Sequence, residues 1–321
     1  MMSSARLFQR LRHIGDRLVR EVRMRAHLHE ARRVLATPPI RPQQDGVVLM
    51  SMIGSRVLLP YLVAVKSLHR HLGMGRIVLI DDGSLTDNDK RVLAHHCGSP
   101  DIIPIGTIDT GQCPRGGTWE RLLTLLDLRA GDYVIQLDSD TVTIGDLPEI
   151  RSAIAANADF ILLGGEDAEA AGLLPLPDFT ARRYPDGPSA PPAHIQRMIE
   201  SRLASYPDAA LHHYVRGCSG FAGFARGGPA SRVEATRFSR HAEALVGPAI
   251  WSQWGSEQVT SNFLLANEPG VRLLPYARYT NYWRQKASGD ERFVHFIGTY
   301  RYSGPSYRRL TAQAIDRLLA G

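Results

Sequence analysis

The sequence predicts an α/β protein with a mainly parallel central sheet, preceded by an amphipathic N-terminal helix. Three observations support this fold class. Short apolar runs alternate with helical patterns after residue 46, two of these runs end in acidic clusters, and a basic segment opens the chain. With 321 residues, of which 44% are hydrophobic, the chain can bury a full core.

The first 36 residues contain the predicted N-terminal helix. They hold nine arginines and three acidic residues, so their net charge of +6 equals that of the whole chain. Apolar residues recur there at spacings of three and four, which places them on one helical face. Two interpretations stay open: a helix lying on an anionic membrane surface, and an arm for packing or oligomerisation. The apolar residues are Leu7, Leu11, Ile14, Leu18 and Val22.

A proline-rich linker follows this helix. Pro38, Pro39 and Pro42 end the helix, because proline lacks the backbone N–H that a helix interior requires. We therefore divide the chain into a helix with its linker, residues 1–42, and one α/β domain, residues 45–321.

Cysteine usage and hydropathy indicate the compartment. Cys97, Cys113 and Cys218 are far apart and show no spacing typical of a disulfide framework or a zinc site. No run approaches the ~18 apolar residues of a membrane span, and no signal-peptide pattern opens the chain. We expect a cytoplasmic protein, with residues 1–36 as a possible peripheral contact with the inner face of the membrane. Apart from the positive charge, nothing indicates a nucleic-acid partner.

Strand and helix patterns alternate from residue 47 to residue 137. Four strands separated by helices indicate a mainly parallel sheet, in which ligands bind beyond the carboxyl ends of the strands. Residues at those ends are therefore the first candidates for a site. The predicted order is strand 47–53, helix 58–72, strand 76–80, helix 87–96, strand 101–105, helix 119–126 and strand 132–137.

The first acidic cluster, Asp81-Asp82-Gly83-Ser84, follows the second predicted strand. As a hydrogen-bond acceptor, Asp82 suits a ribose or a base, and Gly83 permits a tight turn. Ordinary turn chemistry explains the same residues, with Ser84 or Thr86 capping the next helix. Both interpretations stay open.

The second cluster is Asp138-Ser139-Asp140, directly after the apolar strand 132–137. If the strand continues through the cluster, alternation points the two carboxylates the same way. Two hard oxygen donors suit Mg²⁺ or Mn²⁺, and such an ion neutralises a diphosphate leaving group. A surface turn after a strand is the alternative.

These residues resemble the DXD motif of GT-A glycosyltransferases, and other segments resemble glycosyltransferase family 8 and its relatives. His295 to Arg301 is similar to the family's H-x-x-G-x-x-K signature, with arginine in place of the lysine. The resemblance implies a Rossmann-like nucleotide-diphospho-sugar transferase fold. It makes His295 the third metal ligand, beside Asp138 and Asp140, and makes Arg301 the phosphate clamp. Ser139 and Gly298 then belong to the donor-binding segments.

A further segment resembles the family's D-Q-D-x-x-N pattern. It reads Glu257-Gln258-Val259 and ends at Asn262, with Val259 in place of the second acid. The resemblance makes Glu257 and Gln258 the candidates for sugar binding or catalysis. As an alternative, Glu257 stabilises the first turn of a helix.

Two other similarities support this assignment. Gly217 to Phe224 resembles the segment that passes under the donor sugar, with Cys218 in the place of an asparagine, although a tightly packed strand explains its glycines equally well. Arg121, on the helix before the DXD strand, takes the place of an arginine that faces the donor, or is a solvated arginine paired with an acid such as Asp127.

Residues 165–214 break the alternation around several prolines and a possible helix, 194–205, which suggests an insertion on the acceptor side. Trp251 and Trp254 are either sugar-stacking or core residues.

The resemblance implies a metal-dependent hexosyltransferase of polysaccharide biosynthesis. Its donor is a nucleotide sugar, expected to be a UDP-sugar, its acceptor is a saccharide or a lipid-linked saccharide, its cofactor is Mn²⁺ or Mg²⁺, and its transfer retains anomeric configuration. The alternative mechanism is an inverting transfer with Glu257 as the general base.

Two other classes remain as alternatives. A phosphohydrolase of the haloacid dehalogenase type would use Asp138 as a nucleophile, but it expects the motif on the first strand and a later lysine, whereas Lys286 is the sole lysine after the motif. The second alternative is a catalytically inert sugar-nucleotide-binding protein, because Cys218, Val259 and Arg301 differ from the residues that the family's motifs have at these positions.

Overall fold

A seven-stranded, mostly parallel sheet forms the centre of the computed structural model, which describes residues 4–321 and side chains from residue 15 onward. The first strand, β1, lies in the middle and pairs in parallel with β2 on one side and β4 on the other. The strand β9 runs antiparallel between β4 and β6. From one edge to the other, the strands are β10 (Arg272–Leu273), β6 (Phe160–Leu163), β9 (Gly217–Phe224), β4 (Tyr133–Leu137), β1 (Val47–Ile53), β2 (Arg76–Asp81) and β3 (Asp101–Pro104).

The predicted alternation in residues 47–137 is confirmed. The helices α2 (Leu58–Leu72), α3 (Asp87–Cys97) and α4 (Trp119–Leu128) connect the first four strands. Thr86 begins α3 with a reciprocal capping box to Asp89, and Gly73 ends α2 in the left-handed conformation at φ +69°. The strand predicted at 101–105 ends at Pro104 because Ile105 already begins a short 3-10 turn.

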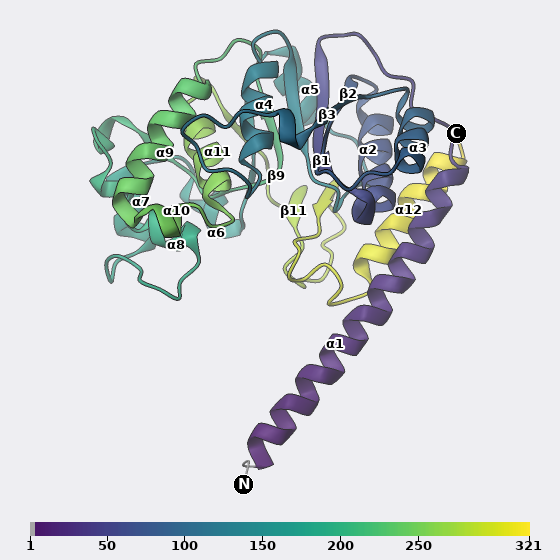
Figure 1. The fold of residues 1–321 in the computed structure, drawn as a ribbon, viewed down its shortest axis with the longest axis horizontal. Coiled ribbons are helices and arrows are strands. Elements are labelled where there is room, and N and C mark those ends of the chain that lie inside the picture. Colours follow the sequence, from purple (N-terminus) through teal and green to yellow (C-terminus); the bar gives the residue numbers. More distant parts are fainter. Residues whose placement is uncertain (1–3) are drawn as a thin grey trace.

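Both faces of the sheet are covered, which explains why β1, β2, β4 and β6 are nearly continuous apolar runs rather than alternating sequences. The face with α2 and α3 also carries α5 (Pro148–Ala155) and the C-terminal helix α12 (Ser306–Leu319). The opposite face carries α4, α9 (Arg232–Val246) and α11 (Ser256–Ala266). In Figure 1, α2, α3 and α12 lie on one side of the molecule, and the helices α7 to α11 lie on the other.

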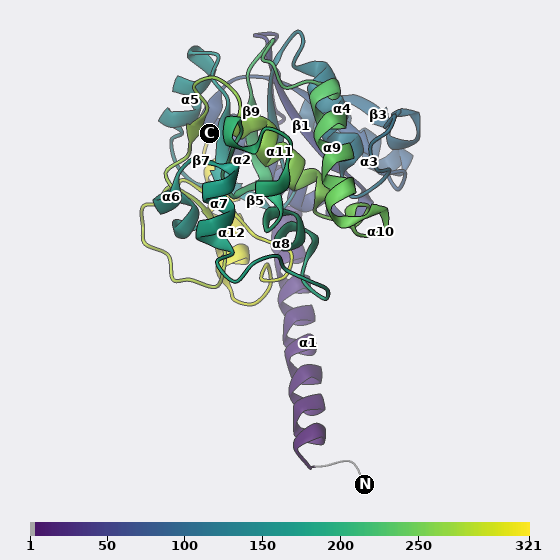
Figure 2. The same cartoon turned by 90° about the vertical axis from the view of Figure 1, so that its left-hand side faces the viewer.

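Residues 165–214 fold into short elements that pack on the second face, in front of α11 as seen in Figure 2. The helix predicted at 194–205 is confirmed in its first half, where α8 follows the N-cap His194, but it ends at Glu200, and a separate 3-10 turn covers Leu203–Ser205. The Ser201 hydroxyl donates to the Met198 carbonyl and accepts from the Ser189 amide. These side-chain hydrogen bonds compete with the backbone hydrogen bonds that would continue the helix. The elements are α6 (Glu166–Ala171), β7 (Leu174–Pro175), α7 (Leu176–Arg183), α8 (Ile195–Glu200), the two 3-10 turns Leu203–Ser205 and Ala209–Leu211, and β8 (His213–Tyr214); α10 (Pro248–Trp251) precedes α11.

A second, three-stranded sheet brings the C-terminal region to the end of β4. Its strands are β11 (Tyr279–Asn281), β12 (Phe293–His295) and β5 (Thr141–Thr143). The strand β12 pairs antiparallel with β5, and this register places His295 opposite Thr141, one residue after the acidic motif.

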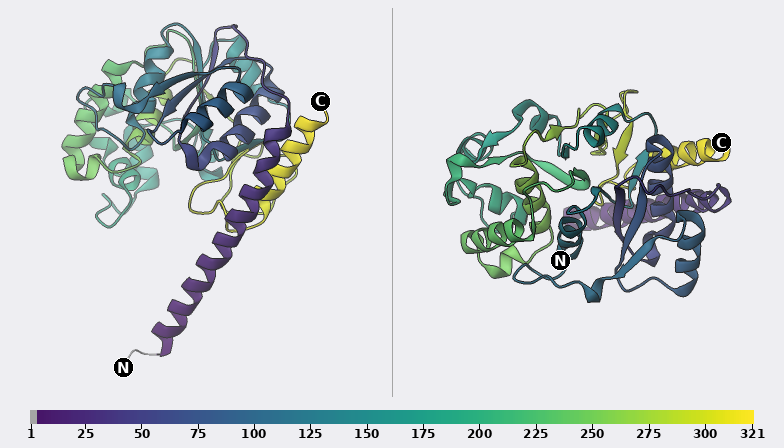
Figure 3. Two further views of the ribbon diagram at one scale, coloured as in Figure 1. Left: turned by 45° about the vertical axis from the view of Figure 1, so that its right-hand side comes forward. Right: turned by 90° about the horizontal axis from the view of Figure 1, so that it is seen from above.

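The N-terminal helix α1 (Ser4–Ala31) and the 3-10 turn Arg32–Ala36 lie against α12. Figure 3 shows α1 beside α12, with its N-terminal part extending beyond the rest of the molecule. Leu18 and Val22 of the predicted apolar face are 62% and 66% exposed. The side chains of Leu7, Leu11 and Ile14 lie outside the described residues. Within residues 4–321, no helix has the length and apolar character that crossing a membrane requires.

Candidate active site

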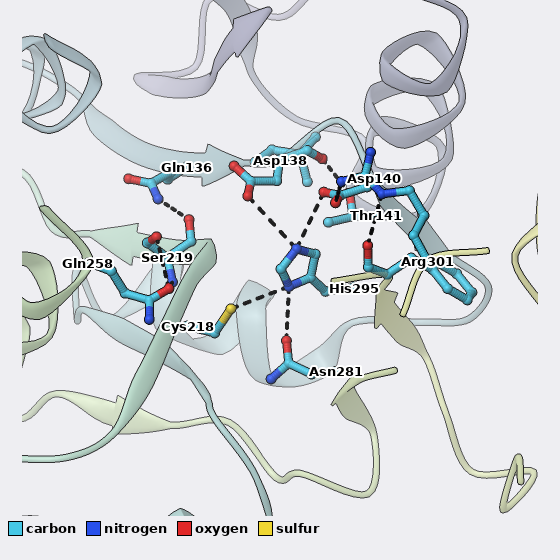
Figure 4. Close-up of polar contacts among 12 residues, drawn as sticks. Gln136, Asp138, Asp140, Thr141, Cys218, Ser219, Gln258, Asn281, His295 and Arg301 are labelled. Carbon is cyan, nitrogen blue, oxygen red and sulfur yellow. Dashed lines mark hydrogen bonds and ion pairs between the residues drawn. The ribbon is translucent and has the colours of Figure 1, made fainter. Parts of the chain in front are cut away.

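Asp138, Asp140 and His295 bring one ligand atom each to a common point, with these atoms all within 4.8 Å of one another. The Nε2 atom of His295 is 3.3 Å from Asp140 Oδ1 and 3.8 Å from Asp138 Oδ2. The second oxygen of each carboxylate is bound by an arginine, Asp138 Oδ1 by Arg121 and Asp140 Oδ2 by Arg301. Figure 4 shows both carboxylates on the same side of the imidazole. Each aspartate therefore keeps one oxygen for a shared ligand.

A turn, not a continuing strand, orients the two carboxylates. The prediction required β4 to run through the motif, but β4 ends at Leu137. The turn is closed by the Thr141 hydroxyl, which donates to the Asp138 carbonyl at 2.9 Å. The amide of Phe296 then donates to the Asp140 carbonyl at 2.8 Å, which ties the motif to the end of β12.

Asn281 selects the tautomer of His295. The Asn281 side-chain NH₂ group donates to the Leu163 carbonyl at 2.7 Å, so its oxygen, Oδ1, must face the Nδ1 atom of His295, 2.9 Å away. In the neutral imidazole we therefore assign the proton to Nδ1, which leaves the Nε2 lone pair facing the aspartates. Cys218 Sγ lies 3.3 Å from the same Nδ1 atom. Gly220 is required beneath the ring, since a Cβ there would lie 2.4 Å from an imidazole atom.

This donor set fits a divalent cation. Two carboxylate oxygens and one neutral imidazole nitrogen match the ligands of Mn²⁺ and similar ions, and the Asn281 contact is the supporting hydrogen bond typical of metal-binding histidines. Burial disfavours the imidazolium, but the neighbouring Cys218 and Asp140 raise the pKa of His295 above its ordinary value. Burial likewise opposes ionisation of Asp140, yet His295 and Arg301 lower its pKa. The raised pKa of His295 favours a second proton on Nε2, which a cation would displace, while Asn281 keeps the first proton on Nδ1.

Arg121 and Glu257 form a buried ion pair behind Asp138. The Arg121 side chain is 5% exposed, and its Nη2 atom is 3.5 Å from Glu257 Oε2. The Thr118 hydroxyl donates to the same carboxylate oxygen at 2.9 Å. Burial raises the pKa of Glu257, and Arg121 partly offsets this. Glu257 is 1% exposed, so it supports Arg121 from behind and does not line the adjacent cavity.

A cavity of about 730 Å³ adjoins the imidazole side of the triad. Cys218 and Asn281, whose side chains contact His295 Nδ1, line this cavity, and so do Gln258 and the exposed Trp254 and Trp283. Among the two tryptophans considered from sequence, Trp254 therefore reaches the cavity. The other, Trp251, is fully buried and donates from its indole N–H to the Ser239 hydroxyl, so it is a core residue.

A hydrogen-bonded relay fixes the Gln258 amide. Its Oε1 atom accepts from the Ser219 amide at 3.3 Å, and its NH₂ group donates to Gln196 Oε1 at 3.1 Å. The Gln196 NH₂ group donates in turn to the buried carboxylate of Glu200 at 2.9 Å. The hydroxyls of Tyr184 and Tyr214 also donate to Glu200. The orientation of Gln258 is thus set by Ser219 of β9 and by residues within 165–214.

Sequence reasoning missed Asn281, Gln196 and Glu200. None of them belongs to a recognisable motif. Asn281 acts on His295, 14 positions away, and Gln196 acts on Gln258, 62 positions away, while Glu200 acts on Gln258 only through Gln196. Asn281 carries one available signal, because a buried amide in a short strand needs a specific partner.

The remaining predicted donor-binding residues lie at the edges of the site. Asp82 is exposed at the carboxyl end of β2, where its Oδ1 atom accepts from the Ser84 amide at 2.9 Å. Ser139 is half-buried in the turn between the two aspartates. Gly298 is exposed in the segment after β12, where a Cβ would lie 3.7 Å from Arg301 Nη2.

The fold resembles those of solved glycosyltransferases. It is similar to the bifunctional glycosyltransferase WbbM in its apo form, with a TM-score of 0.50 and 12% identity over 88% of this chain and 53% of that one. It is also similar to the galactosyltransferase LgtC in complex with donor and acceptor sugar analogs, with a TM-score of 0.44 and 12% identity over 83% and 95% of the two chains. A further similar structure is that of mouse xyloside xylosyltransferase 1 in its apo form, with a TM-score of 0.46 and 12% identity over 79% of this chain and 98% of that one.

This chain spans about half the length of WbbM. No protein-family model and no curated protein matches the sequence. The structural likeness shows that the fold is the GT-A glycosyltransferase fold, with its central, mainly parallel sheet.

Proposed function

We propose that this GT-A-fold chain is a metal-dependent glycosyltransferase that moves a hexose from a UDP-sugar to a saccharide or lipid-linked acceptor with retention of configuration. One observation carries the proposal. Asp138, Asp140 and His295 converge at the carboxyl end of the sheet, beside a cavity large enough for sugars.

The position of each site residue gives its proposed role. A divalent cation held by the triad supplies Lewis-acid stabilisation of the departing diphosphate. Arg121 fixes the Asp138 carboxylate, and Arg301, on Asp140, is placed to bind a phosphate oxygen. The exposed Asp82, at the end of the neighbouring strand β2, is our candidate for a ribose or base contact.

Gln258 is the proposed sugar-facing residue. Its amide is held on two sides and lines the cavity beside Cys218 and Asn281, so it can donate to or accept from a sugar hydroxyl without moving. The enclosure of Glu257 supports retention over an inverting mechanism with that carboxylate as base, because a general base must reach the acceptor hydroxyl.

The acceptor side and the membrane contact belong to the same proposal. Trp254 and Trp283 offer aromatic faces for a saccharide at the cavity. The outward face of α1, with Leu18 and Val22 exposed among arginines, suits an anionic lipid surface on the cytoplasmic side, where a lipid-linked acceptor would be presented. Binding of the protein to phosphatidylglycerol vesicles, lost in Leu18→Glu/Val22→Glu, tests this contact.

Nucleotide binding tests the central claim. We expect UDP, measured against GDP, ADP and CDP by calorimetry, to bind with Mn²⁺ and to lose binding in Asp140→Ala and His295→Ala, while the exposed control Asp101→Ala keeps it. Failure of every nucleoside diphosphate to bind would overturn the proposal. Phosphate release from p-nitrophenyl phosphate would instead indicate the phosphohydrolase, and UDP-sugar binding without any hydrolysis or transfer would indicate the inert binder.

A further inference from the structure

The helix α1 has two faces with different surroundings. Arg20, Arg23 and His27 follow one another at spacings of three and four, so they share one face, and all three contact the C-terminal region. Leu18 and Val22 lie on the opposite face and are exposed. The inward face therefore has a defined partner, separate from any lipid contact of the outward face.

That partner is the segment 297–304, between β12 and α12. The Nη2 atom of Arg20 donates to the Gly298 carbonyl at 2.8 Å, and Nη1 of Arg23 donates to the Ser303 carbonyl. One turn further along α1, the buried imidazole of His27 stacks on Tyr307 at a centroid distance of 3.7 Å. Two arginines thus bind carbonyls near the two ends of one short segment.

The segment 297–304 carries Arg301, and its backbone hydrogen bonds are local. The amides of Tyr300 and Arg301 both donate to the Ile297 carbonyl, at 2.9 and 2.8 Å, and the Ser303 amide donates to the Tyr300 carbonyl. Across the site, Arg301 reaches Asp140. Asp140 thus holds the segment from inside the site and α1 holds it from outside, while Tyr300 packs edge-on against Trp283 and Tyr302 packs against Tyr307.

We infer that α1 is part of the donor-phosphate site, with Arg20 and Arg23 as positioning residues that hold the segment 297–304 and so keep Arg301 in place for the diphosphate. This inference rests on the proposed function. Its physical basis is pre-organisation: a cationic group that is already ordered loses less conformational entropy when it binds phosphate. The two guanidinium charges also add positive potential beside the anionic ligand.

Four arginines of α1 allow a matched experiment on the full-length protein. The double variant Arg20→Gln/Arg23→Gln removes the inward contacts. The control Arg17→Gln/Arg25→Gln removes the same charge from exposed arginines, of which Arg25 pairs with Glu21 on α1 itself. Calorimetric affinities for UDP and GDP with Mn²⁺ are measured for both, together with amide hydrogen exchange of residues 297–304.

We expect the inward variant to bind the diphosphate about tenfold more weakly and to exchange faster in residues 297–304, because Arg301 must be ordered on binding. The outward variant stays within about twofold of wild type, which screens out a general charge effect. Arg20→Lys/Arg23→Lys, which keeps both donors, recovers most of the affinity and serves as the variant that retains the fold.

The outcomes separate the two proposals. A wild-type protein that binds no diphosphate overturns the proposed function, and this inference with it. A wild-type protein that binds, with inward and outward variants weakened equally or not at all, overturns this inference alone. If amide exchange in the inward variant rises uniformly throughout the chain relative to wild type, and not preferentially in residues 297–304, then α1 has a purely structural role. That result also overturns the inference.

Discussion

Asn281 shows how one buried amide controls the chemistry of a neighbour. Its NH₂ group is committed to the Leu163 carbonyl, so its oxygen can only accept from His295. The imidazole is thereby held in the tautomer whose unprotonated nitrogen faces Asp138 and Asp140. At this scale the candidate metal site depends on four side chains: the three candidate ligands, and Asn281, which orients the imidazole.

We predict that Asn281→Ala weakens Mn²⁺ binding by roughly 10- to 100-fold, the usual cost of losing a hydrogen bond to a metal-binding histidine. Calorimetric titration with Mn²⁺ alone measures this. Asn88→Ala, at an exposed position on α3, is the control and keeps wild-type affinity. Unchanged affinity in Asn281→Ala would contradict the tautomer assignment.

Gln196 has the corresponding role for Gln258. With Gln196→Ala, the NH₂ group of Gln258 loses its acceptor and the amide is free to rotate. We expect kcat for hydrolysis of UDP-galactose or UDP-glucose to fall by about tenfold or more, while UDP affinity stays near wild type, because the diphosphate contacts are untouched. The exposed Gln253→Ala is the matched control. Loss of UDP affinity together with kcat would argue against a specific effect on Gln258.

Among the elements, the pairing of β5 with β12 matters most for the site. It places His295 opposite Thr141, more than 150 residues away in sequence, and hence beside the acidic turn. The helix α1 is the other decisive element, because its inward face contacts both the segment that carries Arg301 and the helix α12 that follows it.

The docking of α1 is predicted to weaken in acid through His27. Burial, with a smaller contribution from Arg301, lowers the pKa of His27 from 6.5 to about 3. Between these values the unfolded chain binds the proton and the folded chain does not, so stability falls as pH decreases below 6.5. From pH 7 to pH 5 this amounts to about 2 kcal/mol.

Urea unfolding of wild type and His27→Gln at both pH values isolates this effect. Other buried histidines, such as His96, titrate in both proteins, so the difference between the two pH slopes reports His27. A wild-type slope equal to that of His27→Gln would show that the residue does not titrate differently in the folded state.

At the scale of the whole molecule, the site lies where several packed layers meet. The triad joins the end of β4 to the small sheet, the relay joins α11 to residues 165–214, and α1 and α12 enclose the segment after β12. A ligand that bridges these parts stabilises all of them at once, so binding is expected to appear in global unfolding.

Removal of metal should therefore cancel the stabilisation by nucleotide. At a UDP concentration 100 times its Kd, with saturating Mn²⁺, the folded state gains about 2.7 kcal/mol, which raises Tm by several degrees. An excess of EDTA is expected to return Tm to the value without nucleotide, and re-addition of Mn²⁺ to restore it. Full stabilisation by UDP in EDTA would contradict a metal-dependent donor site.

The alternation of strands and helices in residues 47–137 is predictable from sequence because its signals are local. Strands buried on both faces need continuous apolar runs, and Thr86 and Gly73 mark helix ends through their own side chains or backbone. The same local logic places Asp138 and Asp140 at the end of a strand, where the sheet edge makes them candidates for a site.

The tertiary structure decided the rest, because it depends on contacts between residues far apart in the chain. A motif of spaced residues suggests His295 as a partner of the aspartates, but only the ladder between β5 and β12 brings the ring to them. Burial places Glu257 behind Arg121 and leaves Gln258 at the cavity, although the two are adjacent in sequence. Packing against α12 likewise separates the inward and outward faces of α1, a distinction that helical spacing alone does not assign to a partner.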